Sequence, residues 1–175
     1  LVRSQKEATY LNSQRENTRF LPGVKIPETA IATESLDNAF DKSEVILFAV
    51  PSHSLRQNAK TVANKIDPEA IVVSAVKGLE VGSGKRMSEI LAEELPNTDK
   101  RNICALSGPN LAMEIVKGKP SSTVIASSNI EVCTKAQKLL NSKQLRIYTN
   151  DDIIGVEIGG ALKNITAIAV GISDG

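Results

Sequence analysis

The chain has 175 residues, of which 41% are hydrophobic, and its 21 basic and 20 acidic side chains leave a net charge of +1. This composition is ordinary for a globular protein and argues against disorder of the whole chain. The charge balance excludes the strong positive field of a nucleic-acid-binding protein. No apolar run reaches the roughly 18 residues that a membrane helix needs, so no membrane span is expected.

Two features concern the cellular setting. Cys104 and Cys133 have no metal-ligand spacing and are interpreted as reduced core thiols. Together with the absence of a signal sequence, they predict a cytoplasmic protein. The chain lacks an initiator Met and stops at Gly175, just after a long apolar segment, so we expect it to be an incomplete piece of a larger protein.

The predicted elements alternate along the chain. Residues 4–17 are predicted to form a helix that ends at the breaker residues Leu21-Pro22-Gly23. Residues 44–50 form an apolar run stopped by Pro51, typical of a strand buried on both faces. Helices are then predicted over 52–66, 85–95, 111–116 and 130–141, and strands over 70–76, 102–106, 122–126 and 145–148. Strand and helix in turn predict an α/β fold with a largely parallel sheet.

The pattern changes after Asn150. Asp151-Asp152 is a good helix start, and Ile153 through Val170 continues apolar and rich in small residues for about five turns. This composition predicts a helix buried on most sides, the first of a second, helical domain. The expected domains are therefore residues 1–150 and residues 151–175.

Ligands of an open parallel sheet bind beyond the carboxyl ends of its strands, which directs attention to the loops starting at Pro51, Lys77, Ser107 and Thr149. Lys77 precedes Gly78, which lets the backbone turn, so the lysine can extend over the sheet edge; a solvated lysine fits equally well. Ser107-Gly108-Pro109-Asn110 leads from a strand to a helix and suits either a polar ligand or an ordinary turn.

The segment from Gly155 to Asn164 carries the strongest signal. Glycine disfavours a helix interior by about 1 kcal/mol, so the cluster of Gly155, Gly159 and Gly160 predicts a close approach of backbone or ligand. Lys163 lies one turn after Gly159 on the same face. A lysine in so apolar a run is unfavourable unless paired or used, and desolvation would lower its pKa towards the range of a general base.

Four motifs together resemble the bacterial-type NAD(P)-dependent glycerol-3-phosphate dehydrogenases. In chain order they are Val50-Pro51-Ser52-His53, Lys77-Gly78-Leu79-Glu80, Leu106-Ser107-Gly108-Pro109, and Gly160-Ala161-Leu162-Lys163-Asn164 followed by Ser173-Asp174-Gly175. The resemblance runs along essentially the whole chain, and its last motif is the most specific. It implies a Rossmann-like domain followed by an all-helical domain, and the interconversion of sn-glycerol 3-phosphate and dihydroxyacetone phosphate for phospholipid synthesis.

The resemblance also implies roles for individual residues. Lys163 would accept the proton of the C2 hydroxyl in oxidation and return it in reduction, and Lys77 would polarise the reacting oxygen between substrate and nicotinamide. Gly108, Asn110 and Asn164 would contact the substrate. Ala112 would contact the cofactor, as would Lys77. Two adjacent lysines would also lower one another's pKa.

The cofactor is expected to be NADPH or NADH. The Gly-x-Gly-x-x-Gly fingerprint is absent, so the first strand, glycine loop and helix of the nucleotide domain would precede Leu1, and phosphate-binding residues would follow Gly175. Arg3 would fall at the end of the second strand and meet the 2′-phosphate of NADPH. The chain alone is expected to be inactive.

Two other functions fit the same residues. A related 3-hydroxyacid or 6-phosphogluconate-type dehydrogenase also places a Lys and an Asn on the first helix of its helical domain, and activity on dihydroxyacetone phosphate would separate the two. A non-catalytic nucleotide-binding module is the third reading, although such a module would not require both Lys77 and Lys163. A homodimer is considered because exposed apolar sheet edges favour association.

Overall fold

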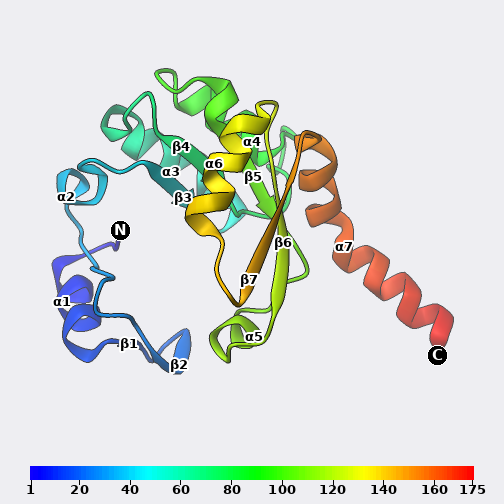
Figure 1. The fold of residues 1–175 in the computed structure, drawn as a ribbon, viewed down its shortest axis with the longest axis horizontal. Coiled ribbons are helices and arrows are strands. Elements are labelled where there is room, and N and C mark those ends of the chain that lie inside the picture. The colour runs from blue at the N-terminus through cyan, green and yellow to red at the C-terminus, as the bar shows by residue number, and fades with distance from the viewer.

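The computed structural model describes residues 1–175, and its centre is a five-stranded sheet (Figure 1). The strands follow chain order across the sheet: β3 (Val45–Phe48), β4 (Ile71–Ser74), β5 (Ile103–Ser107), β6 (Ser121–Ala126) and β7 (Leu145–Asn150). The first three strands are parallel, β6 is antiparallel to β5, and β7 is parallel to β6. The prediction of a largely parallel, Rossmann-like sheet is confirmed.

The reversal between β5 and β6 departs from the strict alternation expected from the sequence. A parallel crossover needs a connection of a dozen or more residues that packs back over the sheet, usually as a helix. Here the connection contains the five-residue helix α5 (Ala112–Val116), which lies beyond the end of β6 and covers no face of the sheet (Figure 1). The chain therefore returns directly, and β6 and β7 run opposite to β3–β5.

Helices cover both faces of the sheet. One core joins Phe48, Val72 and Ile103 to the apolar faces of α3 (Leu55–Val62) and α4 (Met87–Glu94). A second core joins alternate strand residues to α6 (Ile130–Leu140), and its buried members are Ile71, Val73, Cys104, Ile125, Cys133, Ala136 and Ile147. Neighbouring residues of β4 point to opposite faces, so all four are buried. Each fully buried aliphatic side chain contributes about 1.5–3 kcal/mol.

The run 44–50 was expected to be buried on both faces, and that prediction is wrong. It forms β3, which pairs with β4 alone at one end of the sheet order. Phe48 is its one buried residue, whereas Leu47 is 50% exposed. The apolar run correctly identified the strand, but the position of a strand in the sheet order is not encoded in its own hydropathy.

The N-terminal part lies beside the sheet (Figure 1). The predicted helix is α1 (Gln5–Gln14), which Ser4 caps and which ends where Arg15 adopts a φ of 52°. A short antiparallel pair, β1 (Glu16–Asn17) and β2 (Leu21–Lys25), follows it, and α2 (Leu36–Phe40) leads into β3. The breaker residues at 21–23 thus lie inside a strand, which Pro22 permits because β2 has a partner on one side only.

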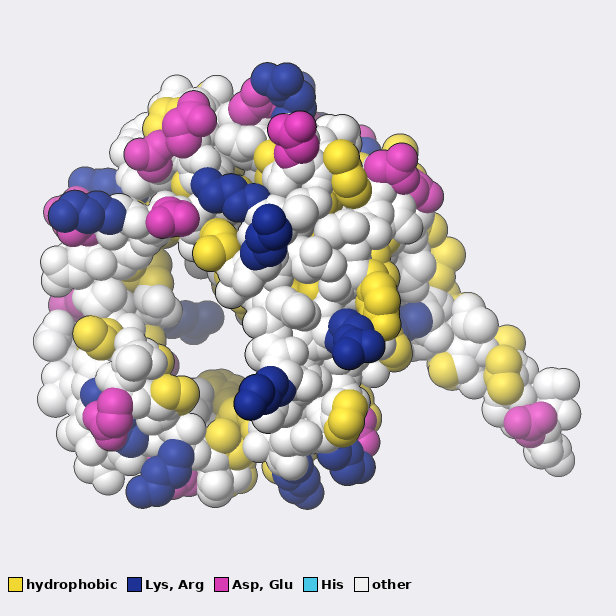
Figure 2. Space-filling model, in the orientation of Figure 1, with side chains coloured by type: hydrophobic (Ala, Val, Ile, Leu, Met, Phe, Trp, Pro, Cys, Tyr) yellow, Lys and Arg dark blue, Asp and Glu magenta, His cyan; other side chains and the backbone are white.

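The last helix, α7 (Ile153–Asp174), is found where the sequence predicts a helix. Its expected burial on most sides is wrong, because Glu157 is its one buried residue. Ile168 is 64% exposed and Ile172 is 77% exposed. The first turns of α7 pack on β5 and β6, and the rest projects away from the sheet with hydrophobic side chains on its surface (Figures 1 and 2).

The length of α7 leaves the expectation of no membrane span unconfirmed. The helix has 22 residues with a mean hydropathy of 1.5 over its best 18-residue window, which is long and apolar enough by length and composition. A single helix of this kind is weak evidence, since helices of soluble proteins share these properties. Lys163 stands in the middle of α7, where a charge disfavours insertion by about 2.5–3.5 kcal/mol.

Candidate active site

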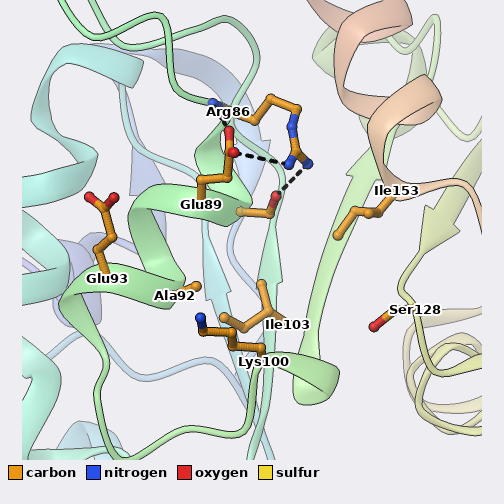
Figure 3. Close-up of a pocket in the computed structure, with 9 residues that line it drawn as sticks. Arg86, Glu89, Ala92, Glu93, Lys100, Ile103, Ser128 and Ile153 are labelled. Carbon is orange, nitrogen blue, oxygen red and sulfur yellow. Dashed lines mark hydrogen bonds and ion pairs between the residues drawn. The ribbon is translucent and has the colours of Figure 1, made fainter.

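Helix α7 runs along the sheet from the edge formed by the amino end of β5 to the edge formed by its carboxyl end. Because β7 runs opposite to β3–β5, its end and the start of α7 lie at the amino end of β5, where Ile153 and Ile103 line one pocket (Figure 3). Seven residues later, Gly160 lies against Ser107 at the carboxyl end of β5. Seven residues of helix advance about 10 Å and the four steps of β5 about 13 Å, so α7 covers most of the length of β5.

The path of α7 corrects the predicted position of Thr149 and explains the position of Lys163. Thr149 was expected at the same edge as Pro51, Lys77 and Ser107, but it ends a strand that runs the other way and lies towards the opposite edge. Lys163 nevertheless reaches the carboxyl edge, because α7 carries it back along the sheet.

A pocket of about 250 Å³ opens where α7 meets the carboxyl end of β5 and the adjoining part of β6. Its walls combine backbone-rich turns with one cationic side chain, and the lining residues are Ser107, Gly108, Pro109, Val124, Gly155, Val156, Gly159, Gly160 and Lys163. A volume of this size suits a small molecule or one part of a larger ligand.

Two lysines meet beside this pocket. The Lys77 ammonium donates a hydrogen bond to the carbonyl oxygen of Gly108 at 3.0 Å, which ties the loop after β4 to the loop after β5. Partial burial lowers the pKa of Lys77 below its ordinary value of 10.5, and the neighbouring Lys163 side chain lowers it further. The structure therefore brings together Lys77, Gly108 and Lys163 from three separate elements.

Gly160 explains how α7 comes so close to the sheet. A Cβ on Gly160 would lie 3.3 Å from the Cβ of Ser107 and closer still to its hydroxyl oxygen. Gly155 lies similarly close to the side chain of Asp152, which accepts a hydrogen bond from the Gly155 N–H. A Cβ on Gly159 would meet nothing within 4 Å, so Gly159 leaves the pocket open. Gly155 and Gly160 are thus explained by close packing, and Gly159 is explained by the open surface of the pocket.

The remaining predicted site residues do not line this pocket. Asn164 follows Lys163 on α7 but is exposed, and Asn110 is half-buried in the turn before α5. Ala112 is exposed at the start of α5. Arg3 is exposed before α1, in the N-terminal part, and its backbone N–H donates to Glu7.

Sequence reasoning missed two charged clusters next to the lysine-bearing segments. Arg56 of α3 forms a two-bond ion pair with Glu80, at 2.7 and 2.8 Å, and also contacts Glu93 and Glu94 of α4. This pairing lowers the pKa of Glu80 to about 2, mainly through the hydrogen bonds from Arg56. Glu80 belongs to the loop that Lys77 begins, so Arg56 holds that loop.

The second missed cluster contains Glu157, which lies on α7 and is 5% exposed at its side chain. Its carboxylate accepts hydrogen bonds from Ser88 and Arg86 at the start of α4. A lone carboxylate in an apolar run is as unusual as a lone lysine, so the argument applied to Lys163 would have identified Glu157 as well.

The fold and the site define a class of protein. A Rossmann-like sheet with its candidate pocket at the carboxyl ends of the strands is typical of α/β proteins that bind a dinucleotide.

Comparison with known proteins defines the family within this class. Residues 1–133 match the N-terminal model, and residues 152–175 the C-terminal model, of the NAD-dependent glycerol-3-phosphate dehydrogenases. The chain belongs to this family, and the resemblance inferred from its motifs is confirmed.

Individual relatives agree with the family assignment. The chain is 45% identical over 175 residues to the glycerol-3-phosphate dehydrogenase [NAD(P)+] of Dehalococcoides mccartyi, covering 99% of the chain and 49% of that protein. It is 42% identical to the enzyme of that name from Clostridium perfringens, covering 94% of the chain and 49% of that protein. The crystal structure of glycerol-3-phosphate dehydrogenase from Coxiella burnetii superposes with a TM-score of 0.84 at 33% identity, covering 98% of this chain and 51% of that one. The chain thus spans about half the length of the relatives it matches.

The residues at the carboxyl edge fit the nicotinamide end of such a cofactor. Gly78 has a φ of +113°, which favours glycine, and a Cβ there would lie 3.7 Å from the Ser52 hydroxyl, so the loops after β3 and β4 lie side by side. Beyond them, Gly159 leaves open space next to Lys163. The sequence contains no Gly-x-Gly-x-x-Gly turn for the pyrophosphate, so the fit concerns the reacting end alone.

Proposed function

We propose that the protein interconverts sn-glycerol 3-phosphate and dihydroxyacetone phosphate by NAD(P)-dependent hydride transfer, supplying glycerophospholipid synthesis. The observation that carries this proposal is that Lys77 lies next to Lys163, which lines a pocket on the carboxyl edge of a Rossmann-like sheet. The names of the relatives support the choice of substrate.

Lys163 is the proposed proton carrier. In the oxidative direction Lys163 takes the proton from the C2 hydroxyl, and in the reductive direction Lys163 returns it. The bound NAD(P) supplies the other half of the chemistry by accepting or donating the hydride at C2.

Lys77 is proposed to polarise the reacting oxygen. Its hydrogen bond to the Gly108 carbonyl holds the ammonium at the carboxyl edge, so positive charge is already placed where the oxygen gains negative charge. The lowered pKa of Lys77 indicates that the two-lysine site releases its first proton more readily than two separated lysines would.

Substrate contacts are proposed for Lys77, Gly108, Asn110, Lys163 and Asn164. Gly108 follows β5 at the pocket wall, and the two lysines offer positive charge to a phosphorylated substrate. Asn164 is the direct neighbour of Lys163, and Asn110 lies two residues after Gly108. Closure around a bound ligand would bring these two amides into contact with the substrate.

Cofactor contacts are proposed for Arg3, Lys77 and Ala112. Arg3 is exposed and its guanidinium is free to meet the 2′-phosphate of NADPH, so the protein accepts NADPH as well as NADH. We also propose a domain boundary near Asn150, between the partial nucleotide domain 1–150 and the start of a helical domain at 151–175. A cytoplasmic location without a membrane span, and a homodimer, complete the proposal.

The proposal is tested by arginine substitutions in the protein at its natural full length. Lys163→Arg keeps the positive charge but cannot accept a proton near neutral pH, so dihydroxyacetone phosphate reduction falls by roughly 10²–10⁴-fold. Lys77→Arg keeps the polarising charge and loses far less. Lys135→Ala on the exposed face of α6 is the control and retains full activity.

Three results would reject the proposal. If Lys163→Arg retained the wild-type rate, Lys163 would not carry the proton. If the wild-type protein reduced a 3-oxoacid but not dihydroxyacetone phosphate, the related hydroxyacid-type activity would be the correct one. Nucleotide binding without any turnover would instead indicate a non-catalytic module.

A further inference from the structure

Glu157 is a buried carboxylate on α7 whose two oxygens are both hydrogen-bonded. Its Oε1 accepts the backbone N–H of Ser88 at 2.8 Å, and its Oε2 accepts the Ser88 hydroxyl at 2.6 Å and the Arg86 guanidinium at 2.9 Å. The Glu157 side chain is 5% exposed and that of Arg86 is 19% exposed. All these bonds join α7 to the first turn of α4, across about 70 residues of sequence.

The chemistry of this contact favours one fixed geometry. The first N–H groups of a helix have no partner inside the helix, and the helix dipole attracts negative charge to that end. Glu157 satisfies the Ser88 N–H and pairs with Arg86 at the same time. Charge-assisted bonds of this kind are short and directional, so the contact fixes the position of α7 along and around its axis.

Arg86 links this contact to the loop that carries Lys77. Its backbone pairs with Leu79 in an antiparallel bridge, and the Glu80 N–H donates to the Lys85 carbonyl at 2.9 Å. The segment from Leu79 to Arg86 is therefore a closed loop, and Lys77 lies two residues before it. Figure 3 shows the Arg86 guanidinium directed towards Glu89, and the same guanidinium donates to the Ser88 hydroxyl at 3.1 Å.

The same contact fixes Lys163. Six residues separate Glu157 from Lys163 on one continuous helix, which is a rise of about 9 Å. A helix transmits a small axial or rotational shift to its next turns almost unchanged. Glu157 is thus connected to Lys163 through the backbone of α7. It is connected to Lys77 through Arg86 and the loop that Arg86 closes.

We propose that Glu157 is a positioning residue that sets the separation of Lys77 and Lys163 by holding α7 against Arg86 and Ser88. Its effect on turnover rests on the proposed function, whereas its effect on the two lysines does not. Glu157 touches neither lysine and acts through the backbone of α7 and the loop at 79–86.

The test compares three variants of the protein at its natural full length. Glu157→Gln removes the charge and places an amide against the Arg86 guanidinium. Ser88→Ala removes the hydroxyl that donates to Glu157 and accepts from Arg86, while leaving the Ser88 N–H in place. Glu89→Gln is the matched control, because Glu89 also contacts Arg86 but belongs to α4 and does not contact α7.

The first readout is the pH dependence of reductive methylation of Lys77, followed by mass spectrometry. As Lys163 recedes, the pKa of Lys77 rises towards 10.5 in Glu157→Gln, and in the same direction by a smaller amount in Ser88→Ala. Glu89→Gln leaves the midpoint unchanged. A methylation midpoint for Lys77 that is unchanged in both Glu157→Gln and Ser88→Ala overturns the proposal.

The second readout is steady-state kinetics well below each melting temperature. Displacement of the lysines by about 1 Å lowers kcat for dihydroxyacetone phosphate by up to about 10²-fold, with the KM of the cofactor nearly constant. A lower melting temperature with unchanged kcat and an unchanged pH profile would show a purely structural anchor and overturn the proposal. If Glu157→Gln does not fold, Ser88→Ala decides by the same criteria. A wild-type protein without dehydrogenase activity would refute the proposed function, while the methylation midpoints still test Glu157.

Discussion

Replacing Gly160 by alanine tests how closely α7 must approach the sheet. The new Cβ would lie 3.3 Å from the Ser107 Cβ and closer to the Ser107 oxygen, so either Ser107 rotates or α7 moves away by several tenths of an ångström. Alanine favours a helix over glycine by about 1 kcal/mol, whereas overpacking costs about 1–3 kcal/mol. The net change in the free energy of unfolding is therefore between about zero and a loss of about 2 kcal/mol.

The effect on activity is expected to exceed the effect on stability. Lys163 lies one turn after Gly160, and a displacement approaching 1 Å can reduce kcat by about 10²-fold. Gly171→Ala is the control, because a Cβ there meets nothing within 4 Å and the site is two turns further along α7. It gains about 1 kcal/mol in stability and leaves kcat unchanged.

A second substitution identifies the contact responsible. Ser107→Ala removes the oxygen that a Cβ at position 160 would meet, so the double variant recovers stability and activity relative to Gly160→Ala. Denaturant melts and steady-state assays of the four proteins give the coupling energy, which should be about 1–3 kcal/mol. Equal losses with and without the Ser107 hydroxyl would refute the close approach of α7 to β5.

Three further predictions concern charge. The pKa of Lys77 is lowered in the folded protein, so protonation of Lys77 disfavours folding below that pKa. The free energy of unfolding should therefore rise with pH from the lowered pKa to 10.5, and urea melts of Lys77→Met should lack this rise. The pKa of Glu80 is about 2 against 4.5 when unpaired, so its pairing with Arg56 stabilises the fold above pH 4.5, and this stabilisation is lost as the pH falls from 4.5 to about 2. In urea melts, the free energy of unfolding of Glu80→Gln should depend less on pH in that window, and an unchanged slope would contradict the ion pair. Arg3→Ser should raise the KM for NADPH by about ten-fold or more, the value of a charged hydrogen bond, without changing that for NADH; equal changes for both cofactors would remove Arg3 from the 2′-phosphate site.

The strands and most helices could be predicted from the sequence because each has a local signal. The apolar run at 44–50, the breaker Pro51 and the helix start at Asp151-Asp152 all correspond to observed boundaries within a few residues. What could not be predicted depends on non-local geometry. The reversal of β6 follows from how a short connection lies in space, and the exposure of β3 follows from its place in the sheet order.

In the candidate site, too, the sequence predicts what has a local signal and misses what depends on non-local geometry. Lys163 was identified because a charge in an apolar, glycine-rich helix is unusual wherever the helix lies. Its meeting with Lys77 was implied by the family resemblance alone, because it depends on the path of α7 from one sheet edge to the other and no local pattern encodes that path. The cluster around Arg56 depends on contacts between distant segments, and its members look like ordinary surface charges when taken singly. Glu157 is unusual in its apolar run, but its partners Ser88 and Arg86 cannot be predicted from the sequence because they lie about 70 residues away.

The central claim is that Lys77 and Lys163 act as one site, and a double-mutant cycle tests it most directly. The measured quantity is kcat/KM for dihydroxyacetone phosphate in the wild type, Lys77→Ala, Lys163→Ala and the double variant, in the protein at its natural full length. Residues that act as a unit are strongly non-additive, so the double variant should lose about as much activity as Lys163→Ala alone. Losses that simply multiply would show that the two lysines act independently and would contradict the account.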